Sequence, residues 1–479
     1  MDHEDLSRSL PPLSPLSQYI NSSTLSVPII MVIELDSPIE KSKMIEFLRD
    51  VFVPINDRFS SIIVTDKKGV QRWKKVEITI EDHIFFPTFP SSGQTLEDYD
   101  ALLDTYVSKV AMETTSEGGR RPPWEVHAFT YPTSNAKGTI VFKLSHAIGD
   151  GYSLMSALFN IYKRADDPSL PVTMPSVVPR PIGGGGSSRW SRIRSFVSMC
   201  VNTVTDSALS LLQATLLEDD KTVIRSGKVG VEFEPISISS VTFTLDQIRQ
   251  VQDKVGGTTV NEVMTGVISY AIQLYIQRTG KVSNGATRMT ALVVVNARML
   301  RGFKTIADML KAHIWGNHFS LLHVALPSTS SDQDLNNVDP LEFIIKAKDE
   351  LRRKRNSMAL YFTSRIWNII SSLKGPEVAA GYVHAIFKNT SISISSLIGP
   401  SQKIVIADHP INSFYYTVAG IPQSLIFTIV SYMGKLKVVV RTEREFIDAQ
   451  VFVSCLKDAL EKISDAADDH GKDGKVEFH

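Results

Sequence analysis

Cysteine is nearly absent from this chain of 479 residues, which contains only Cys200 and Cys455. Two cysteines cannot build the disulfide framework that stabilises small secreted domains, so we expect a reducing compartment. The sequence has neither paired cysteines nor the H-E-x-x-H spacing of zinc enzymes, and it therefore offers no recognisable metal site. A G-x-S-x-G segment is missing as well, which argues against a serine hydrolase.

Long hydrophobic runs are also missing. No segment reaches the ~18–20 uninterrupted apolar residues of a membrane-spanning helix. The nearest is "FVSMCVNTVTDSALSLLQATLL" at 196–217, which Asn202, Asp206 and Gln213 interrupt. We interpret it as an amphipathic or buried helix, of the kind that can lie on a membrane without spanning it. The acidic, proline-rich start "MDHEDLSRSLPPLSP" lacks the apolar core of a signal peptide.

An excess of charge of either sign is lacking, since 51 lysines and arginines balance 51 aspartates and glutamates. The overall charge therefore gives no reason to expect a nucleic-acid partner. An apolar content of 43% and a charged content of 21% are those of a folded globular protein. The chain is longer than one ordinary core requires, so we expect two domains.

Strand and helix patterns follow one another without a regular βαβ repeat, which predicts a mixed α/β fold. The clearest linker is "PVTMPSVVPRPIGGGGSSR", because prolines and successive glycines sustain no regular element. We therefore divide the chain into a first domain at 1–175, a linker with an amphipathic helix at 176–235, and a second domain at 236–479. Strands are expected at 27–36, 61–66, 74–86, 138–145, 288–298 and 319–326, helices at 95–113, 152–165, 258–280, 339–355 and 446–467, and a hairpin at 425–443.

The segment "SHAIGDG" at 145–151 joins an apolar run to an amphipathic helix and is the strongest candidate for chemistry. An imidazole that titrates near neutrality can take the proton of a hydroxyl whose oxygen attacks an acyl carbonyl, so His146 is a candidate general base. Asp150 lies in the turn, where a carboxylate is expected to brace the backbone or to pair with an arginine. Gly149 and Gly151 permit the turn and a close approach to a ligand. The alternative is a structural histidine, since H-x-x-x-D occurs by chance in many chains.

Alternation along the expected strand separates Ser145 from His146. Successive side chains of a strand point to opposite faces, so Leu144 and His146 share one face, and Lys143 and Ser145 share the other. We therefore do not expect Ser145 to be a nucleophile that His146 activates.

Short segments in order along most of the chain match the motifs of one family. They are "PLSP" (12–15), "DRFSS" (57–61), "RPPWEVHAF" (121–129), "SHAIGDG" (145–151), "TVNEVMTGV" (259–267), "VVNAR" (294–298), "WGNHFS" (315–320), "SSLIGP" (395–400) and "SYMGKLKVVV" (431–440). This set resembles the plant bifunctional wax ester synthase/diacylglycerol acyltransferases. That family belongs to the CoA-dependent acyltransferases with an H-H-x-x-x-D-G signature. One such motif is weak evidence, but this many in family order is strong.

The resemblance implies two chloramphenicol-acetyltransferase-like domains around a central active-site tunnel. It also implies that a long-chain acyl group is transferred from acyl-CoA to a fatty alcohol or to diacylglycerol. On this basis His146 would be the general base, and Asp150, next to Gly151, would be a structural brace paired with Arg298. Asn317 would lie near the tunnel, where its amide could bond the developing oxyanion or CoA, or serve the structure alone.

The resemblance places the acceptor pocket near "PLSP", that is Pro12, Leu13, Ser14 and Pro15. It implies acyl-CoA as a co-substrate and no metal or other cofactor. The expected partners are fatty acyl-CoA, a fatty alcohol or diacylglycerol, and a membrane surface, without nucleic acid. The expected location is the cytosolic face of the endoplasmic reticulum membrane, with peripheral or monotopic attachment favoured over spanning. The apolar segment at 359–375 is either a buried helix or an interfacial one.

Several positions depart from the family pattern. Ser145 replaces the first histidine of the signature, Glu262 the aspartate of N-D-V, and Ser320 the last glycine of W-G-N-x-x-G, while "NARM" replaces N-L-R-P. These departures keep two alternatives open: an acyltransferase for another hydroxylated acceptor, and a diverged acyl-CoA or lipid-binding protein without activity. A soluble acyltransferase of specialised metabolism is disfavoured, because the D-F-G-W-G segment of such enzymes is absent.

Overall fold

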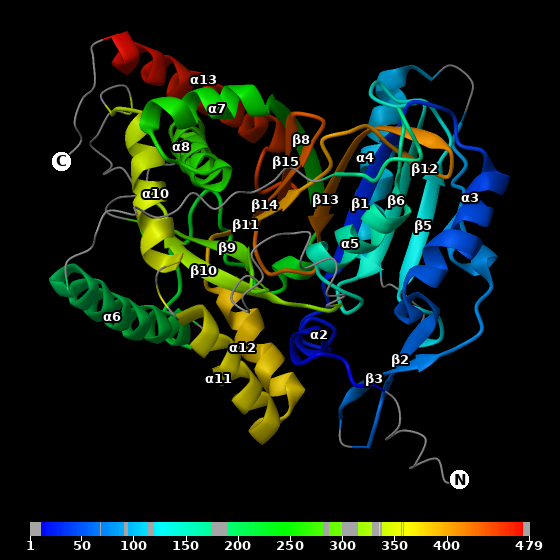
Figure 1. The fold of residues 1–479 in the computed structure, drawn as a ribbon, viewed down its shortest axis with the longest axis horizontal. Helices are drawn as coiled ribbons and strands as arrows, with labels where there is room; N and C mark the ends of the chain where they lie inside the picture. Colours follow the sequence, from blue (N-terminus) through cyan, green and yellow to red (C-terminus); the bar gives the residue numbers. More distant parts are fainter. Residues whose placement is uncertain are drawn as a thin grey trace.

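Two β-sheets lie side by side at the centre of the protein, and helices pack around them (Figure 1). The computed structural model describes residues 11–67, 69–90, 94–113, 119–173, 189–213, 215–280, 287–298, 315–327, 335, 338–355, 357 and 359–472. The predicted mixed α/β class is confirmed. The strands β1, β6, β14 and β15 are long, mostly apolar runs, and nearly all of their residues are buried.

The first sheet has seven strands in the order β4-β5-β6-β1-β13-β12-β7. Its central pairs, β1 with β6 and β1 with β13, are antiparallel. The helix α4 (Leu96–Met112) packs against β1 and β6. The strands are β1 (Pro28–Leu35), β4 (Ile84–Phe85), β5 (Trp124–Phe129), β6 (Gly138–Ser145), β7 (Lys163–Arg164), β12 (Ile404–Ile406) and β13 (His409–Val418).

The second sheet has six strands in the order β10-β9-β11-β14-β15-β8, and in it β11 runs parallel to both β9 and β14. The helices α7 (Leu245–Val255), α8 (Val260–Thr279), α10 (Leu341–Arg355) and α13 (Ala449–Lys472) gather on its outer side (Figure 1). The strands are β8 (Ile236–Thr244), β9 (Thr290–Asn296), β10 (Phe319–Ala325), β11 (Ile392–Ile398), β14 (Leu425–Tyr432) and β15 (Lys435–Glu443).

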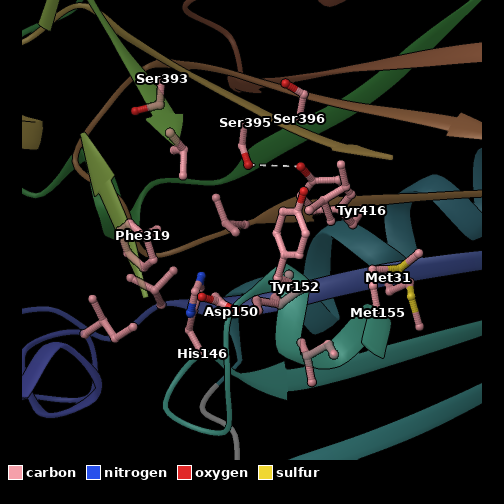
Figure 2. A pocket seen from close by; sticks show the side chains of 18 of the residues that line it. Met31, His146, Asp150, Tyr152, Met155, Phe319, Ser393, Ser395, Ser396 and Tyr416 are labelled. Carbon is pink, nitrogen blue, oxygen red and sulfur yellow. Dashed lines mark hydrogen bonds between the residues drawn. The ribbon is translucent and has the colours of Figure 1, made fainter. Parts of the chain in front are cut away.

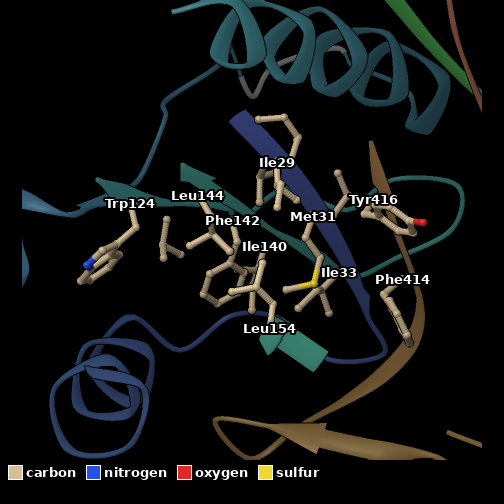
Figure 3. Close-up of a cluster of buried hydrophobic side chains, with 14 of the residues drawn as sticks. Ile29, Met31, Ile33, Trp124, Ile140, Phe142, Leu144, Leu154, Phe414 and Tyr416 are labelled. Carbon is tan, nitrogen blue, oxygen red and sulfur yellow. The ribbon is translucent and has the colours of Figure 1, made fainter. Parts of the chain in front are cut away.

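One segment of the second half of the chain completes the first sheet. Strand β13 pairs with β1 in register, so that Tyr416 lies opposite Met31 and Phe414 opposite Ile33. Figure 3 shows the resulting cluster, in which side chains of β13 join those of β1 and β6. The second half of the chain therefore contributes strands β12 and β13 to the sheet that the first half builds. The domain bounds at 175 and 235 stay a prediction.

The hairpin predicted at 425–443 is confirmed, and its turn residues Met433 and Gly434 both have positive φ, at 49° and 74°. Two successive residues with positive φ match the right-handed twist of the flanking strands, which favours a two-residue hairpin loop.

The strand predicted at 74–86 is wrong. Strand β3 (Gln71–Lys75) pairs only with β2 (Ser61–Thr65), and a 3₁₀ turn at Ile80–Asp82 precedes the short β4. The alternation of apolar residues follows burial instead: Val76 and Ile78 are half-buried and Ile80 is buried, while Glu77 and Thr79 are exposed, as the chain crosses from this hairpin to the first sheet. An alternating pattern shows which side chains are buried. Whether the segment is a strand depends on backbone hydrogen bonds to a neighbouring strand.

Four further helices lie near one another at one end of the molecule (Figure 1). They are α2 (Pro15–Tyr19), α6 (Arg189–Gln213), α11 (Ala359–Lys374) and α12 (Pro376–Lys388). Helix α11 packs against both α6 and α12, and α12 packs against α2. Across the part of the chain that the structure describes, every helix is too short or too polar to cross a bilayer.

Candidate active site

A mostly apolar pocket lies between the two sheets and receives side chains from both (Figure 2). Residues of β1, β6 and helix α5 (Gly151–Ile161) form one wall, and residues of β9, β10 and β11 form the facing wall. Strand β13 contributes Phe414 and Tyr416, and α12 contributes Phe387. The described polar side chains among the lining residues are His146, Asp150, Tyr152, Asn296, Ser393, Ser395, Ser396 and Tyr416.

His146 enters this pocket from the first residue beyond β6. Its backbone N–H donates to the carbonyl of Val27, so the sheet continues to position it after the strand has ended. The described lining residues include Leu144 and His146 but not Ser145, as the alternation of strand faces predicts. The Ser145 hydroxyl instead donates to Asn21 Oδ1 at 3.3 Å, away from the pocket.

Asn317 fixes the orientation of the imidazole. Its Nδ2 donates to two oxygens, the carbonyl of His146 and Oγ of Ser17, each at 2.8 Å. A carbonyl only accepts, so Nδ2 must face it, and Oδ1 of Asn317 must then face His146 Nδ1, 2.8 Å away. Nδ1 of His146 therefore carries a hydrogen, and in the neutral ring Nε2 is left with the lone pair of a base.

Burial lowers the pKa of His146 below its ordinary value of 6.5, although the nearby Asp150 carboxylate and the hydrogen bond with Asn317 act in the opposite direction. The ring is therefore neutral at neutral pH. A neutral ring with a free Nε2 in an apolar pocket can accept a proton from a hydroxyl bound beside it.

Asp150 is fully engaged by its neighbours. The guanidinium of Arg298 donates to both of its carboxylate oxygens, at 2.7 and 3.1 Å, and the backbone N–H groups of His318 and Ser153 donate at 2.8 and 2.9 Å. Burial raises the pKa of this carboxyl, but the charge and hydrogen bonds of Arg298 outweigh that effect and hold the pKa below its usual value. The pairing of Asp150 with Arg298 is as the resemblance implied. A carboxylate bound in this way holds the turn together and is not free to take a proton.

Arg298 also ties the motif to the second half of the chain. Its Nη2 donates to Ser153 Oγ at 2.8 Å and to the carbonyl of Gly316 at 3.0 Å. The turn after β6 is therefore held against the segment that carries Asn317. The guanidinium of Arg298 therefore holds both the turn that carries His146 and the segment that carries Asn317.

The residues Pro12, Leu13, Ser14 and Pro15 stand beside the site, outside the described pocket lining. Ser14 caps α2, and its Oγ lies 2.7 Å from Ser17 Oγ, which in turn accepts from Asn317. In the structure this segment therefore supports Asn317, and Ile20, just after α2, is the first lining residue.

Sequence reasoning missed several residues of the site. Arg58 of "DRFSS" and Trp315 of "WGN" both donate to the carbonyl of Ile148, at 2.6 and 2.5 Å. Burial lowers the pKa of Arg58 to about 10, which still leaves it a cation at neutral pH. The motifs themselves pointed to these positions, but which carbonyl they bind is a long-range contact. The hydroxyls of Ser395 and Tyr416, 3.0 Å apart, also carried no sequence signal (Figure 2).

The departure Glu262 has a structural explanation, whereas nothing in the structure explains Ser320. Glu262 completes a capping box with Thr259 at the start of α8, since its carboxylate accepts from Thr259 N–H at 2.8 Å and its own N–H donates to Thr259 Oγ1. Its other carboxylate oxygen accepts from Arg352. Ser320 is a buried residue of β10, opposite Val295 in the ladder. Neither Glu262 nor Ser320 belongs to the described pocket lining.

Among the described residues, no group of three or more histidine, cysteine, aspartate or glutamate side chains is arranged to hold a metal ion.

The fold is similar to solved structures of two-domain enzymes. A wax ester synthase/diacylglycerol acyltransferase from Marinobacter aquaeolei VT8 superposes with a TM-score of 0.59 at 16% identity, covering 95% of this chain and 100% of the other. The starter condensation domain of the rhizomide synthetase RzmA superposes with a TM-score of 0.55 at 12% identity, over 98% and 97% of the two chains. The architecture is thus the two-lobed, chloramphenicol-acetyltransferase-like one with a site between its sheets.

Sequence comparisons identify the family. The model "Wax ester synthase/diacylglycerol acyltransferase catalytic domain" matches residues 66–264, and the model "WS/DGAT C-terminal domain" matches residues 315–464. Wax ester synthase/diacylglycerol acyltransferase 4 of Arabidopsis thaliana is 28% identical over 455 residues, 89% of this chain and 84% of the relative. Wax ester synthase/diacylglycerol acyltransferase 3 of the same plant is 26% identical, over 98% of this chain and 96% of the relative. The chain belongs to the wax ester synthase/diacylglycerol acyltransferase family and is an acyltransferase.

Proposed function

We propose that this enzyme transfers a long-chain acyl group from acyl-CoA to the hydroxyl of a fatty alcohol, of diacylglycerol, or of both, with His146 as the general base. The observation that carries the proposal is the orientation of His146 in the pocket, with Nδ1 held by Asn317 and Nε2 left free. The apolar walls suit the hydrocarbon chains of such substrates, because burying each methylene is worth about 0.8 kcal/mol.

The reaction needs one proton carrier. Nε2 of His146 takes the proton of the acceptor hydroxyl while that oxygen attacks the thioester carbonyl. The carbon–sulfur bond of the tetrahedral intermediate then breaks, and the imidazolium returns the proton to the CoA sulfur. The products are an ester and free CoA, and the enzyme forms no covalent intermediate. In this scheme acyl-CoA is a co-substrate, and no metal or further cofactor takes part.

Asp150 and Arg298 have a supporting role in this proposal. They keep the turn after β6 closed, so that His146 stays in the pocket, and Gly151 allows α5 to start against the pocket wall. The residues 12–15 act through Ser17 and Asn317, and Ile20 would be the nearest residue to touch the acceptor. For the location we propose the cytosolic face of the endoplasmic reticulum membrane, with peripheral attachment, as the family resemblance implies.

The test is ester formation by the purified full-length protein with radiolabelled palmitoyl-CoA, offered hexadecanol and diacylglycerol in parallel. We expect product from the parent protein and a loss of about 10²–10⁴-fold in kcat for His146→Ala, the usual contribution of a general base. Lys403→Ala, at a partly exposed position outside the described pocket lining, is the matched control and should keep full activity. The ester that forms identifies the acceptor.

Unchanged activity in His146→Ala would overturn the assignment of the base. If the parent protein makes no ester with either acceptor, but does so with another hydroxylated compound, the acceptor class is wrong and the mechanism stands.

A further inference from the structure

Helix α6 is amphipathic with its polar side facing the protein. Among its residues whose side chains the structure describes, the buried ones are Asp206, Ser210 and Gln213, all of them polar. Among the same residues the large apolar side chains Val197, Val201, Val204, Leu211 and Leu212 are exposed, Val201 to 55% and Val204 to 69%, and Met199 and Leu209 are half-buried. A helix that served only to cover a protein core would have the opposite orientation.

Specific contacts hold the polar side of α6 in this orientation. Lys354 of α10 forms a buried ion pair with Asp206, with 2.6 Å between Nζ and Oδ1. Gln213 donates through Nε2 to Thr290 Oγ1 of β9, and its carbonyl accepts from Asn389 at 2.6 Å. Turning the apolar side inward would break a buried ion pair, which costs about 3–5 kcal/mol. The outward-facing apolar side is therefore a fixed property of this surface.

The neighbouring helix α11 also carries exposed apolar side chains. It packs against α6, and among its described residues Trp367 is buried in a core cluster. Its residues Ile369 and Leu373, one helical turn apart, are exposed to 56% and 79%. We call the exposed side chains Val197, Val201, Val204, Leu211, Ile369 and Leu373 the apolar face. On α6 the positions 197, 201, 204 and 211 recur at helical spacing and therefore share one side of the helix. Soluble proteins seldom leave several large apolar side chains exposed on one side of a helix, so this face indicates a partner.

The charges of these two helices indicate what that partner is. Arg189, Arg192 and Arg194 occupy the start of α6, and α11 carries Arg365 and Lys374. The single acidic residue in the two helices is Asp206, which is buried against Lys354. An apolar face combined with basic residues is the pattern of a helix that lies in the interface of an anionic lipid bilayer. A second copy of the chain would bring the same positive charges together.

We propose that the apolar face of α6 and α11 docks this protein on the surface of an anionic phospholipid bilayer. The docking surface is linked to the substrate pocket: α11 packs on α12, and Phe387 of α12 lines the pocket together with Ile20 and Ile421. Docking on this side would bring that end of the pocket close to the lipid phase, where long-chain alcohols and glycerides dissolve. The proposal specifies the membrane attachment put forward under the proposed function, but binding to lipid can be measured without catalysis.

The experiment is co-sedimentation of the full-length protein with vesicles of phosphatidylcholine, with and without about a quarter of phosphatidylserine. We expect binding that is stronger to the anionic vesicles and weakens as salt is added. The variant Val201→Asn with Val204→Asn should partition at least about tenfold less, because two apolar side chains no longer enter the lipid. The matched control is Leu96→Asn with Leu170→Asn, two side chains exposed to 45% on the first half of the molecule, and it should bind as the parent does.

Three results would overturn the proposal. They are absence of binding to both vesicles, equal binding of parent and Val201→Asn/Val204→Asn, or a solution dimer that the same pair of changes dissociates. Ester formation from substrates dispersed in detergent is measured on the same samples and should be unchanged in this variant. A protein that binds vesicles but makes no ester would refute only the proposed function, and one that makes ester but ignores vesicles would refute only the docking surface.

Discussion

Nη1 of Arg298 lies 2.7 Å from Oδ2 of Asp150, although 148 positions separate the two residues in the chain. The pair joins the turn after β6 to the segment just after β9, and so connects the two halves of the protein four residues beyond His146 in the chain. The catalytic histidine proposed here depends on this connection, because its own position is set by residues from both halves.

The ion pair can be tested by its removal. Arg298→Ala leaves the Asp150 carboxylate buried without its counter-charge, so we expect a loss of about 3–5 kcal/mol in the free energy of unfolding. Urea unfolding followed by circular dichroism measures it. Arg249→Ala, which removes an exposed pair with Asp246, is the control and should leave stability unchanged. Equal midpoints for the two variants would show that Arg298 does not hold the halves together.

Asn317 is expected to position His146 without touching substrate. Asn317→Ala removes the acceptor of the Nδ1 hydrogen and lets the ring adopt the wrong tautomer or rotate. We expect kcat to fall by about 10–100-fold with little change in KM, as for other residues that orient a histidine. A rise in KM with kcat preserved would instead place Asn317 in substrate binding.

Asn317→Asp tests whether Asn317 acts on the imidazole, because a purely structural role would leave the pH dependence of the rate unchanged. A carboxylate facing Nδ1 stabilises the imidazolium, so the pKa of His146 should rise and the acid limb of the rate profile should shift to higher pH. Ser17→Ala, which removes one acceptor of Asn317 Nδ2, is the comparison and should leave that limb where it is in the parent.

The pH dependence of the parent enzyme follows from the burial of His146. Its pKa is lowered from 6.5, so the base is neutral and active above that pH. Activity should be lost only as the pH falls through the lowered value, when Nε2 becomes protonated. We expect kcat/KM, measured between about pH 5 and 8, to show one acid limb with its midpoint below 6.5. A midpoint above that value would mean that an opposite charge, not burial, dominates at the site.

Gly151 is expected to set the width of the pocket. A Cβ at this position would lie 2.8 Å from Cδ1 of Leu397, a residue that lines the pocket, so Gly151→Ala must displace Leu397 and reshape the pocket wall. The strain of such overpacking, ~1–3 kcal/mol, should raise the KM for the long-chain acceptor about tenfold. Adding Leu397→Ala should restore a KM close to that of the parent. Failure of this second change to compensate would show that Gly151 acts on the backbone turn instead.

Ser145 should matter little to the chemistry. Its hydroxyl bonds Asn21 and accepts from Ala147 N–H, on the side of the strand away from the pocket. Ser145→Ala should therefore lower stability by about 1 kcal/mol and change kcat less than threefold. Thermal unfolding and the ester assay on the same preparation check both. A large gain of activity in Ser145→His would show that the first signature histidine contributes to catalysis.

Much of the local structure could be predicted from the sequence. The apolar run of β6, the Gly-Asp-Gly turn and the start of α5 follow from periodicity and turn chemistry, which act between near neighbours. The hairpin at 425–443 could be predicted for the same reason. The strand expected at 74–86 failed because an alternating pattern says nothing about the hydrogen-bond partner that a strand needs.

Only the tertiary structure decided how these elements meet. The sequence by itself indicated that a strand leads up to His146 and is followed by a tight turn, and that residues 196–217 form an amphipathic or buried helix. The fold decided that β13 crosses to the first sheet, that Asn317 faces Nδ1 of His146, and that α6 turns its polar side inward. The physical reason is that periodicity shows which side chains share a face, whereas the partner of that face is set by contacts between residues far apart in the chain.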